Sequence, residues 1–183
     1  DLHAWEQLIE KIKHSKGTIK IALVGKYVEL HDAYISVREA LNHAASVNAV
    51  ELDLTWVHSG DLEEDGGAEV LNSMAGIIVP GGFGNRGIEG KIHAAQYARE
   101  HRMPYFGLCL GLQVMLIDFA RHVLKYRSAN SLEFNLDADA AILEQGQTQI
   151  GDEDKKEPMR LGLYPCKLVP STKAQAAYQA ALV

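Results

Sequence analysis

The chain has 183 residues, of which 47% are hydrophobic and 23% charged, and a formal net charge of −6. This balance is ordinary for one globular domain, and the negative charge argues against binding to nucleic acid or to an anionic membrane surface. Two cysteines are too few for a disulfide scaffold, and the most apolar window, 108–117, is too short to cross a membrane. We therefore expect a cytoplasmic protein without a membrane span.

The hydrophobic pattern predicts helices and strands that alternate along the chain. An amphipathic segment comes first, and we interpret residues 1–17 as a linker helix that follows another domain. Asp32 is the expected N-cap of the second helix. Strands are predicted at 18–25, 50–57, 76–79 and 104–108, and helices at 33–47, 68–73, 88–101 and 110–122.

This alternation predicts an α/β fold, with a doubly wound, mostly parallel sheet and helices on both faces, in the flavodoxin-like arrangement. Residues 18–183 are expected to form this domain. Within it, 135–157 is polar and is assigned no chemistry, 159–169 is a predicted strand and 173–182 a predicted helix. Ligands of such sheets bind beyond the carboxyl ends of the strands, where the 80–87 loop and Cys109 fall.

Cys109 lies between Gly107 and Gly111, where a predicted strand becomes a helix. This spacing is typical of a nucleophile elbow, because glycines two residues before and after the apex let the helix and backbone approach closely. A helix N-terminus favours a thiolate, and the amide of Leu110 could help to hold an oxyanion. The alternative is an inert buried cysteine that acts as a small hydrophobe.

The loop from Gly82 to Gly87 matches G-x-G-x-x-G between a strand and a helix. A dinucleotide site is disfavoured, because Cys109 stands where the ribose-binding acid should follow. An oxyanion hole built by Gly81 or Gly82 with Leu110 connects the two loops better, and a plain glycine turn is the alternative. The segment after the first strand lacks the glycine spacing of a P-loop, and the histidines lack the spacing of a metal site, so no metal is expected.

Two motifs, GLCLGLQ at 107–113 and PGGFGNRG at 80–87, resemble those of the triad-type glutamine amidotransferases. Further stretches look like the glutaminase domain of the CTP synthase family: VGKYVELHDAY at 24–34, VPGGFGNRGIEGKI at 79–92, ANSLEF at 129–134 and MRLG at 159–162. The resemblance covers about 18–169 and is poor over 135–158.

The resemblance implies that L-glutamine is hydrolysed through a thioester on Cys109, with oxyanion amides from Gly81 or Gly82 and Leu110. The released ammonia would serve the ATP-dependent amination of UTP to CTP in a separate synthetase domain, where ATP and Mg are expected. No cofactor is implied in the glutaminase domain itself. The full-length enzyme would be a homo-oligomer, a tetramer.

The resemblance also implies the residues that bind glutamine. Glu133 would bind the α-amino group and Arg160 the α-carboxylate, a pairing that suits a zwitterion. The other members of the implied binding set are Gly82, Phe83, Leu110 and Gln113.

One part of the family pattern, an H-x-E pair that completes the catalytic triad, does not occur in these 183 residues. We therefore expect the domain's C-terminal end to be missing, and the polypeptide to be weak or inactive as a glutaminase. His122, the only histidine after Cys109, is predicted not to be the base. Another triad-type amidotransferase, a cysteine hydrolase, or a non-catalytic domain of the same fold remain as alternatives.

Overall fold

The computed structural model describes residues 2–82, 84–135, 140–143 and 163–183. It divides into two compact units, Asp1–Gln145 and Gly146–Val183, and each is described by itself. No helix in the described ranges is long and apolar enough to cross a membrane.

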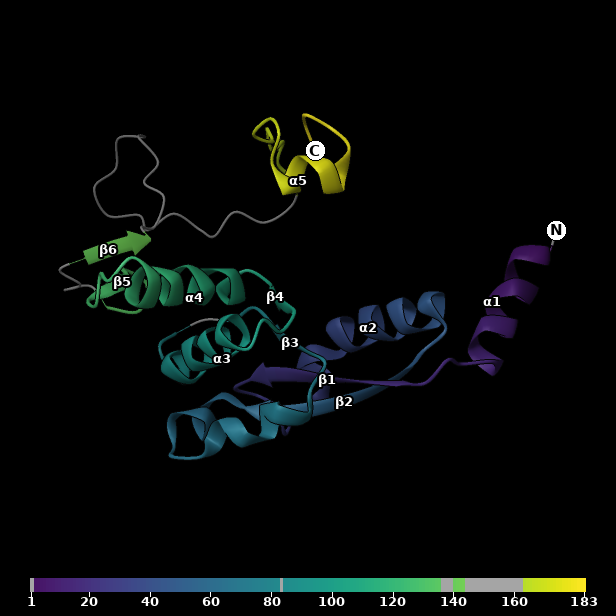
Figure 1. Ribbon diagram of the computed structural model, residues 1–183, viewed down its shortest axis with the longest axis horizontal. Coiled ribbons are helices and arrows are strands. Elements are labelled where there is room, and N and C mark those ends of the chain that lie inside the picture. Colours follow the sequence, from purple (N-terminus) through teal and green to yellow (C-terminus); the bar gives the residue numbers. More distant parts are fainter. Residues whose placement is uncertain (1, 83, 136–139, 144–162) are drawn as a thin grey trace. The chain divides into compact units, whose positions relative to one another are not determined.

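The first unit contains a four-stranded parallel sheet made of β1 (Thr18–Gly25), β2 (Glu51–His58), β3 (Gly76–Val79) and β4 (Tyr105–Gly107). The strand order is β2-β1-β3-β4 (Figure 1). After β1 the chain goes outward to β2, and it then returns past β1 to form β3 and β4. The order therefore reverses between β1 and β3, which is the switch point of a doubly wound sheet. This confirms the predicted α/β architecture.

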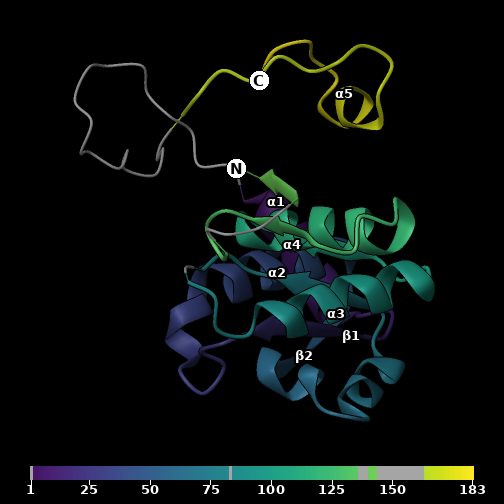
Figure 2. The same ribbon diagram turned by 90° about the vertical axis from the view of Figure 1, so that its left-hand side faces the viewer.

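Helices and short helical segments connect the strands (Figures 1 and 2). The α-helices are α1 (His3–Lys13), α2 (Ile35–Asn48), α3 (Ile88–Glu100) and α4 (Leu110–Asp118). The 3₁₀ segments are η1 (His31–Tyr34), η2 (Ser59–Glu63) and η3 (Gly67–Ser73), and α4 continues into a π-helical turn, η4 (Phe119–Val123).

Two apolar clusters cover the two faces of the sheet. On β1, Ala22 and Val24 point into the cluster formed with η2, η3, α3 and α4. Leu23, between them, points to the opposite face and packs with α2 and with Tyr34. Alternate residues of the strand thus contact different layers, and both faces of β1 are buried.

The start of the second helix differs from the prediction. Asp32 is not its N-cap, because it lies inside η1, and Tyr34 holds the N-cap position without a side-chain capping bond. The Tyr34 side chain is buried, and its hydroxyl accepts hydrogen bonds from the backbone N–H of Lys26 at 3.2 Å and of Tyr27 at 3.4 Å. Burial of this ring therefore favours an extra 3₁₀ turn before α2.

A small parallel sheet, β5 (Ala129–Ser131) paired with β6 (Ala140–Leu143), was not predicted. It contacts the elbow helix α4. In the second unit, residues 163–169 contain no strand but an isolated antiparallel bridge between Lys167 and Leu182. The predicted helix 173–182 is shorter, α5 (Lys173–Tyr178), because Gln179 takes a left-handed conformation and turns the chain back toward that bridge. Residues 159–162 lie outside the described residues.

Candidate active site

Cys109 stands at the sharp turn between β4 and α4, with φ 53° and ψ −107°. A positive φ is unfavourable for a side chain with a Cβ, and such strain persists only where the surroundings enforce it. The residue is exposed and its thiol is free. An exposed cysteine with positive φ at a strand-to-helix turn confirms the elbow geometry predicted from the glycine spacing, and the residue is not buried as the alternative requires.

The two flanking glycines are required by contact. A Cβ at Gly107 would clash with the backbone of Gly111 and would lie 2.6 Å from the N of Leu112. A Cβ at Gly111 would overlap the carbonyl of Val79 in β3. The helix therefore packs against both strands at distances that no larger residue permits.

The backbone around Cys109 is held by the first turn of α4 on one side and lies against Gly81 on the other. The carbonyl of Cys109 accepts hydrogen bonds from the N–H groups of Leu112 at 3.0 Å and Gln113 at 3.2 Å. Leu110 is the first residue of α4, so its own N–H has no acceptor within the helix. On the other side, a Cβ on Gly81 would lie 3.4 Å from the Cβ of Cys109. The structure thus brings Gly81, Cys109 and Leu110 together.

Gln113 follows Cys109 by four positions, so the two residues share one face of the first turn of α4. Its side-chain Oε1 is buried and has no hydrogen-bond partner among the residues that the structure describes. Buried polar atoms of this kind are rare and call for an explanation. A donor on a bound substrate would supply the missing bond.

Glu133 is half-buried and follows β5, the strand that contacts α4. Its backbone N–H donates to the Ser131 hydroxyl at 3.2 Å, while the Ser131 carbonyl accepts from Phe134 and Asn135, both at 3.0 Å. A tight turn therefore holds the backbone that carries Glu133. Phe83 and Arg160, the other predicted glutamine-binding residues, lie outside the described residues.

His122 pairs with Asp118, at the end of α4 that is distant from the Cys109 thiol. Its Nδ1 lies 2.7 Å from Oδ1 of the buried Asp118, which also binds the guanidinium of Arg99 at 2.8 and 3.1 Å. His122 follows Cys109 by thirteen positions, which along a helix is roughly 20 Å. This position agrees with the prediction that His122 is not the catalytic base.

A cluster of cationic side chains, Lys26, Arg86 and Lys91, lies at the 80–87 loop, which we call the glycine loop, and was not predicted from the sequence. Lys91 of α3 is 1% exposed, and a Cβ on Gly82 would lie 3.9 Å from its Nζ. Burial, followed by the charge of Lys26, lowers the pKa of Lys91 to about 8. Lys26 and Arg86 both lie over the ring of Tyr27, with 5.1 and 5.7 Å to its centroid. In the sequence, the VGKY motif at 24–27 could have drawn attention to Lys26. Nothing in the helical pattern around Lys91 distinguishes it from a lysine that is exposed to solvent.

Tyr105 is a second unpredicted support of the elbow. Its hydroxyl donates to the carbonyl of Gly111, in the first turn of α4, at 2.8 Å. Burial, and then the charge of Asp118, raises the pKa of Tyr105. The hydroxyl therefore keeps its proton and stays a donor at any physiological pH.

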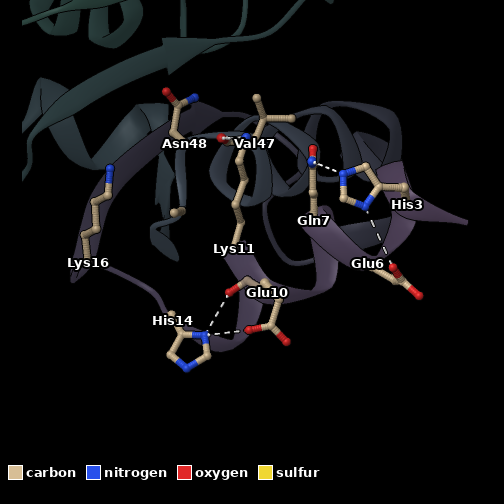
Figure 3. A pocket seen from close by; sticks show the side chains of 10 residues that line it. His3, Glu6, Gln7, Glu10, Lys11, His14, Lys16, Val47 and Asn48 are labelled. Atoms are coloured by element: carbon tan, nitrogen blue, oxygen red, sulfur yellow. Dashed lines mark hydrogen bonds and ion pairs between the residues drawn. The ribbon is translucent and has the colours of Figure 1, made fainter.

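Within the described ranges, no group of three or more His, Cys, Asp and Glu side chains is arranged to hold a metal ion. A hollow between α1 and the end of α2 is lined by polar side chains such as Gln7, Lys11 and Asn48 (Figure 3). Because α1 precedes β1 and the end of α2 precedes β2, this hollow lies near the amino ends of the strands, opposite the edge that carries Cys109.

The fold and the elbow place an exposed cysteine at the carboxyl edge of an α/β sheet, an arrangement typical of enzymes with an elbow nucleophile. Comparison with known proteins identifies the class further, because the model of the class-I glutamine amidotransferase family matches residues 29–176. The chain belongs to this family.

Relatives of the chain within this family include CTP synthases. The chain is 54% identical over 179 residues to the CTP synthase of Roseiflexus castenholzii, covering 97% of this chain and 32% of that protein. It is 52% identical over 178 residues to the CTP synthase of Chloroflexus aurantiacus, covering 97% and 33%. The solved glutaminase domain of Trypanosoma brucei CTPS with bound acivicin matches with a TM-score of 0.76 and 34% identity, over 90% of this chain and 64% of that one. These matches confirm the resemblance to a CTP synthase glutaminase domain, and the chain spans about a third of the curated relatives' length.

Proposed function

We propose that this chain is a glutaminase that releases ammonia from L-glutamine through a thioester on Cys109. The observation that carries the proposal is the strained, exposed Cys109 at an elbow whose glycines are required by contact. The family match supports glutamine as the substrate. The CTP synthase relatives support the same chemistry over nearly the whole chain.

In the proposed reaction the Cys109 thiolate attacks the side-chain amide carbon of glutamine. The carbonyl π electrons move to oxygen, and the oxyanion accepts hydrogen bonds from the amides of Leu110 and of Gly81 or Gly82. The C–N bond then breaks, the departing nitrogen takes the proton that the thiol had given to its proton acceptor, and ammonia is released while a glutamyl thioester remains on the sulfur. Water adds to the thioester carbon, and the C–S bond breaks to give glutamate and the free thiol. The reaction needs a proton acceptor for the thiol, and His122 does not supply it.

The substrate's polar ends would be bound separately. The orphan Oε1 of Gln113 accepts a hydrogen bond from the substrate, and Glu133 binds its ammonium group. Arg160 is proposed to bind the α-carboxylate through its two-pronged guanidinium, and Phe83 to wall the pocket beside Gly82.

The activity of the whole protein is a further part of the proposal, because the chain spans about a third of its relatives. Ammonia would pass to a synthetase domain that binds ATP and Mg and converts UTP to CTP, in a cytoplasmic tetramer. Residues 1–17 would form the linker from that domain. In its support, α1 has an exposed apolar stripe that includes Trp5 at 64% and Ile12 at 53% exposure.

An electrophilic glutamine analogue tests the nucleophile. Acivicin, which is bound in the T. brucei domain, is a suitable probe. We expect one covalent adduct on the wild-type protein by intact mass, none on Cys109→Ala, and an unchanged adduct on the matched control Cys166→Ala. An adduct that survives Cys109→Ala would refute the assignment.

The same assay separates the alternative functions. Protection of Cys109 by free L-glutamine, and not by a peptide that contains a glutamine residue, favours a glutaminase over a cysteine hydrolase. Arg160→Lys in the full-length protein should weaken glutamine protection, because a point charge replaces a bidentate fork. Absence of any adduct on the folded full-length protein would instead favour a non-catalytic domain.

A further inference from the structure

We propose that Arg121 is a positioning residue that fixes Glu133 relative to the glycine loop, residues 80–87, which contains Gly81 and Gly82. This rests on the proposed glutaminase function. Arg121 lies in η4, the π-helical turn after α4, and its side chain is 16% exposed. Single π-helical turns inside α-helices are often found at functional sites. Here the turn directs one guanidinium toward two other elements.

The first partner is Glu89 of α3. The Nη1 of Arg121 lies 2.7 Å from Oε2 of Glu89, the second residue of that helix. The residue before it, Ile88, is 4% exposed and begins α3 directly after the 80–87 loop. The ion pair therefore attaches Arg121 to the helix that carries the loop with Gly81.

The second partner is the backbone of β5. The Nε of Arg121 donates to the carbonyl of Ala129 at 2.8 Å, and Ala129 is fully buried. A buried carbonyl that loses its donor is unfavourable, so this bond is difficult to replace. From Ala129 the chain runs through β5 to the Ser131 turn that holds the backbone of Glu133.

The planar guanidinium of Arg121 thus joins α3, which follows the 80–87 loop, to β5, which precedes Glu133. Glu133 is the residue proposed to bind the substrate's ammonium group. Lysine cannot reproduce this bridge, because an ammonium has no fork that spans two fixed acceptors. Loss of the bridge would leave Cys109 and its elbow intact but would let Glu133 shift relative to the thiol. The effect should fall on glutamine binding and not on the chemistry of the thiolate.

The test uses the full-length protein with Arg121→Gln and Arg121→Lys, measuring glutamine hydrolysis and CTP formation from added ammonia. We expect Arg121→Gln to raise KM for glutamine about 10-fold, with kcat changed by less than about 3-fold and ammonia-supported turnover unchanged. Arg121→Lys should give an intermediate KM. The control Arg38→Gln, at an arginine that pairs with its exposed neighbour Glu39, should keep the wild-type KM.

Three outcomes would count against the inference. A wild-type KM in folded Arg121→Gln would overturn it, and so would equal losses of glutamine-supported and ammonia-supported turnover, which indicate a general structural role. If Arg121→Gln does not fold, a wild-type KM in Arg121→Lys would overturn it as well. Failure of the proposed function is distinct, because the wild type itself would then use ammonia and not glutamine.

Discussion

Replacing Lys91 by methionine isolates the effect of burying a charged amine beneath the glycine loop. Burial, and then the charge of Lys26, lowers the pKa of Lys91 from 10.5 to about 8. A shift of this size corresponds to about 3 kcal/mol of unfavourable free energy for the charged form. Methionine keeps an unbranched side chain of similar length and carries no charge. We expect Lys91→Met to raise the free energy of unfolding by about 1–3 kcal/mol at pH 7.

The gain must depend on pH in one direction. The pKa of Lys91 is lower in the folded state than in the unfolded state, so between pH 8 and 10.5 the unfolded chain binds more protons. Wild-type stability therefore rises with pH in this window. The full penalty applies below pH 8, and above about pH 10.5 the amine is neutral in both states. The advantage of Lys91→Met should shrink by about 2 kcal/mol between pH 7 and pH 10.

Urea unfolding followed by circular dichroism at pH 7, 8, 9 and 10 measures this difference. The control is Lys13→Met on α1, where the lysine side chain is 64% exposed and removal of its charge should change the free energy of unfolding little. An advantage of Lys91→Met that stays constant over this range would refute the reasoning. A variant less stable than wild type at pH 7, with an unchanged denaturant slope, would refute it too.

Tyr105→Phe should lower the free energy of unfolding by about 1–2 kcal/mol, because the hydrogen bond from the hydroxyl to the Gly111 carbonyl is lost. It should also slow the reaction of the Cys109 thiol with a glutamine analogue, and unchanged urea and inactivation curves would contradict this. Gly111→Ala should lose more than about 2 kcal/mol or fail to fold, since its Cβ would overlap a carbonyl of β3; a wild-type melting temperature would show that the contact can relax. Asp118→Asn leaves Arg99 and His122 without their carboxylate and should lose about 2–4 kcal/mol in urea unfolding. The activity remaining in Asp118→Asn should keep its pH profile, and a displaced profile would implicate His122 in catalysis.

The sequence was sufficient to predict the sheet and the elbow, because both depend on local patterns. The run 18–25 is rich in β-branched residues and forms β1 at the predicted bounds. Gly107 and Gly111 constrain the backbone over five residues, so their spacing alone indicates the turn at Cys109. The β-branched run and the glycine spacing each lie within eight consecutive residues, so they can be recognised without knowledge of tertiary contacts.

The remaining features depend on contacts between distant segments. Lys91 lies in a helix pattern where a lysine is normally exposed, and only the packing of α3 under the glycine loop buries it. Arg121 finds its acceptors 32 positions before it and eight after it, with no motif to indicate either. Asp32 has the composition of an N-cap, but burial of the Tyr34 ring moves the start of α2.

The close approach of the 80–87 loop and Cys109 follows from the register of β3 and β4. Val79 of β3 pairs with Gly107 of β4 in a parallel ladder, and the N–H of Leu108 donates to the Val79 carbonyl at 2.9 Å. Two residues beyond this pair on each strand are Gly81 and Cys109. Equal steps from one register pair bring the two positions side by side, at the 3.4 Å that a Cβ on Gly81 would have from the Cys109 Cβ. A one-residue slip between β3 and β4 would place another residue against the thiol and would turn the β3 side chains to the opposite face. Because all four β3 residues are buried, the core that stabilises the sheet also fixes the geometry of the edge that carries Cys109.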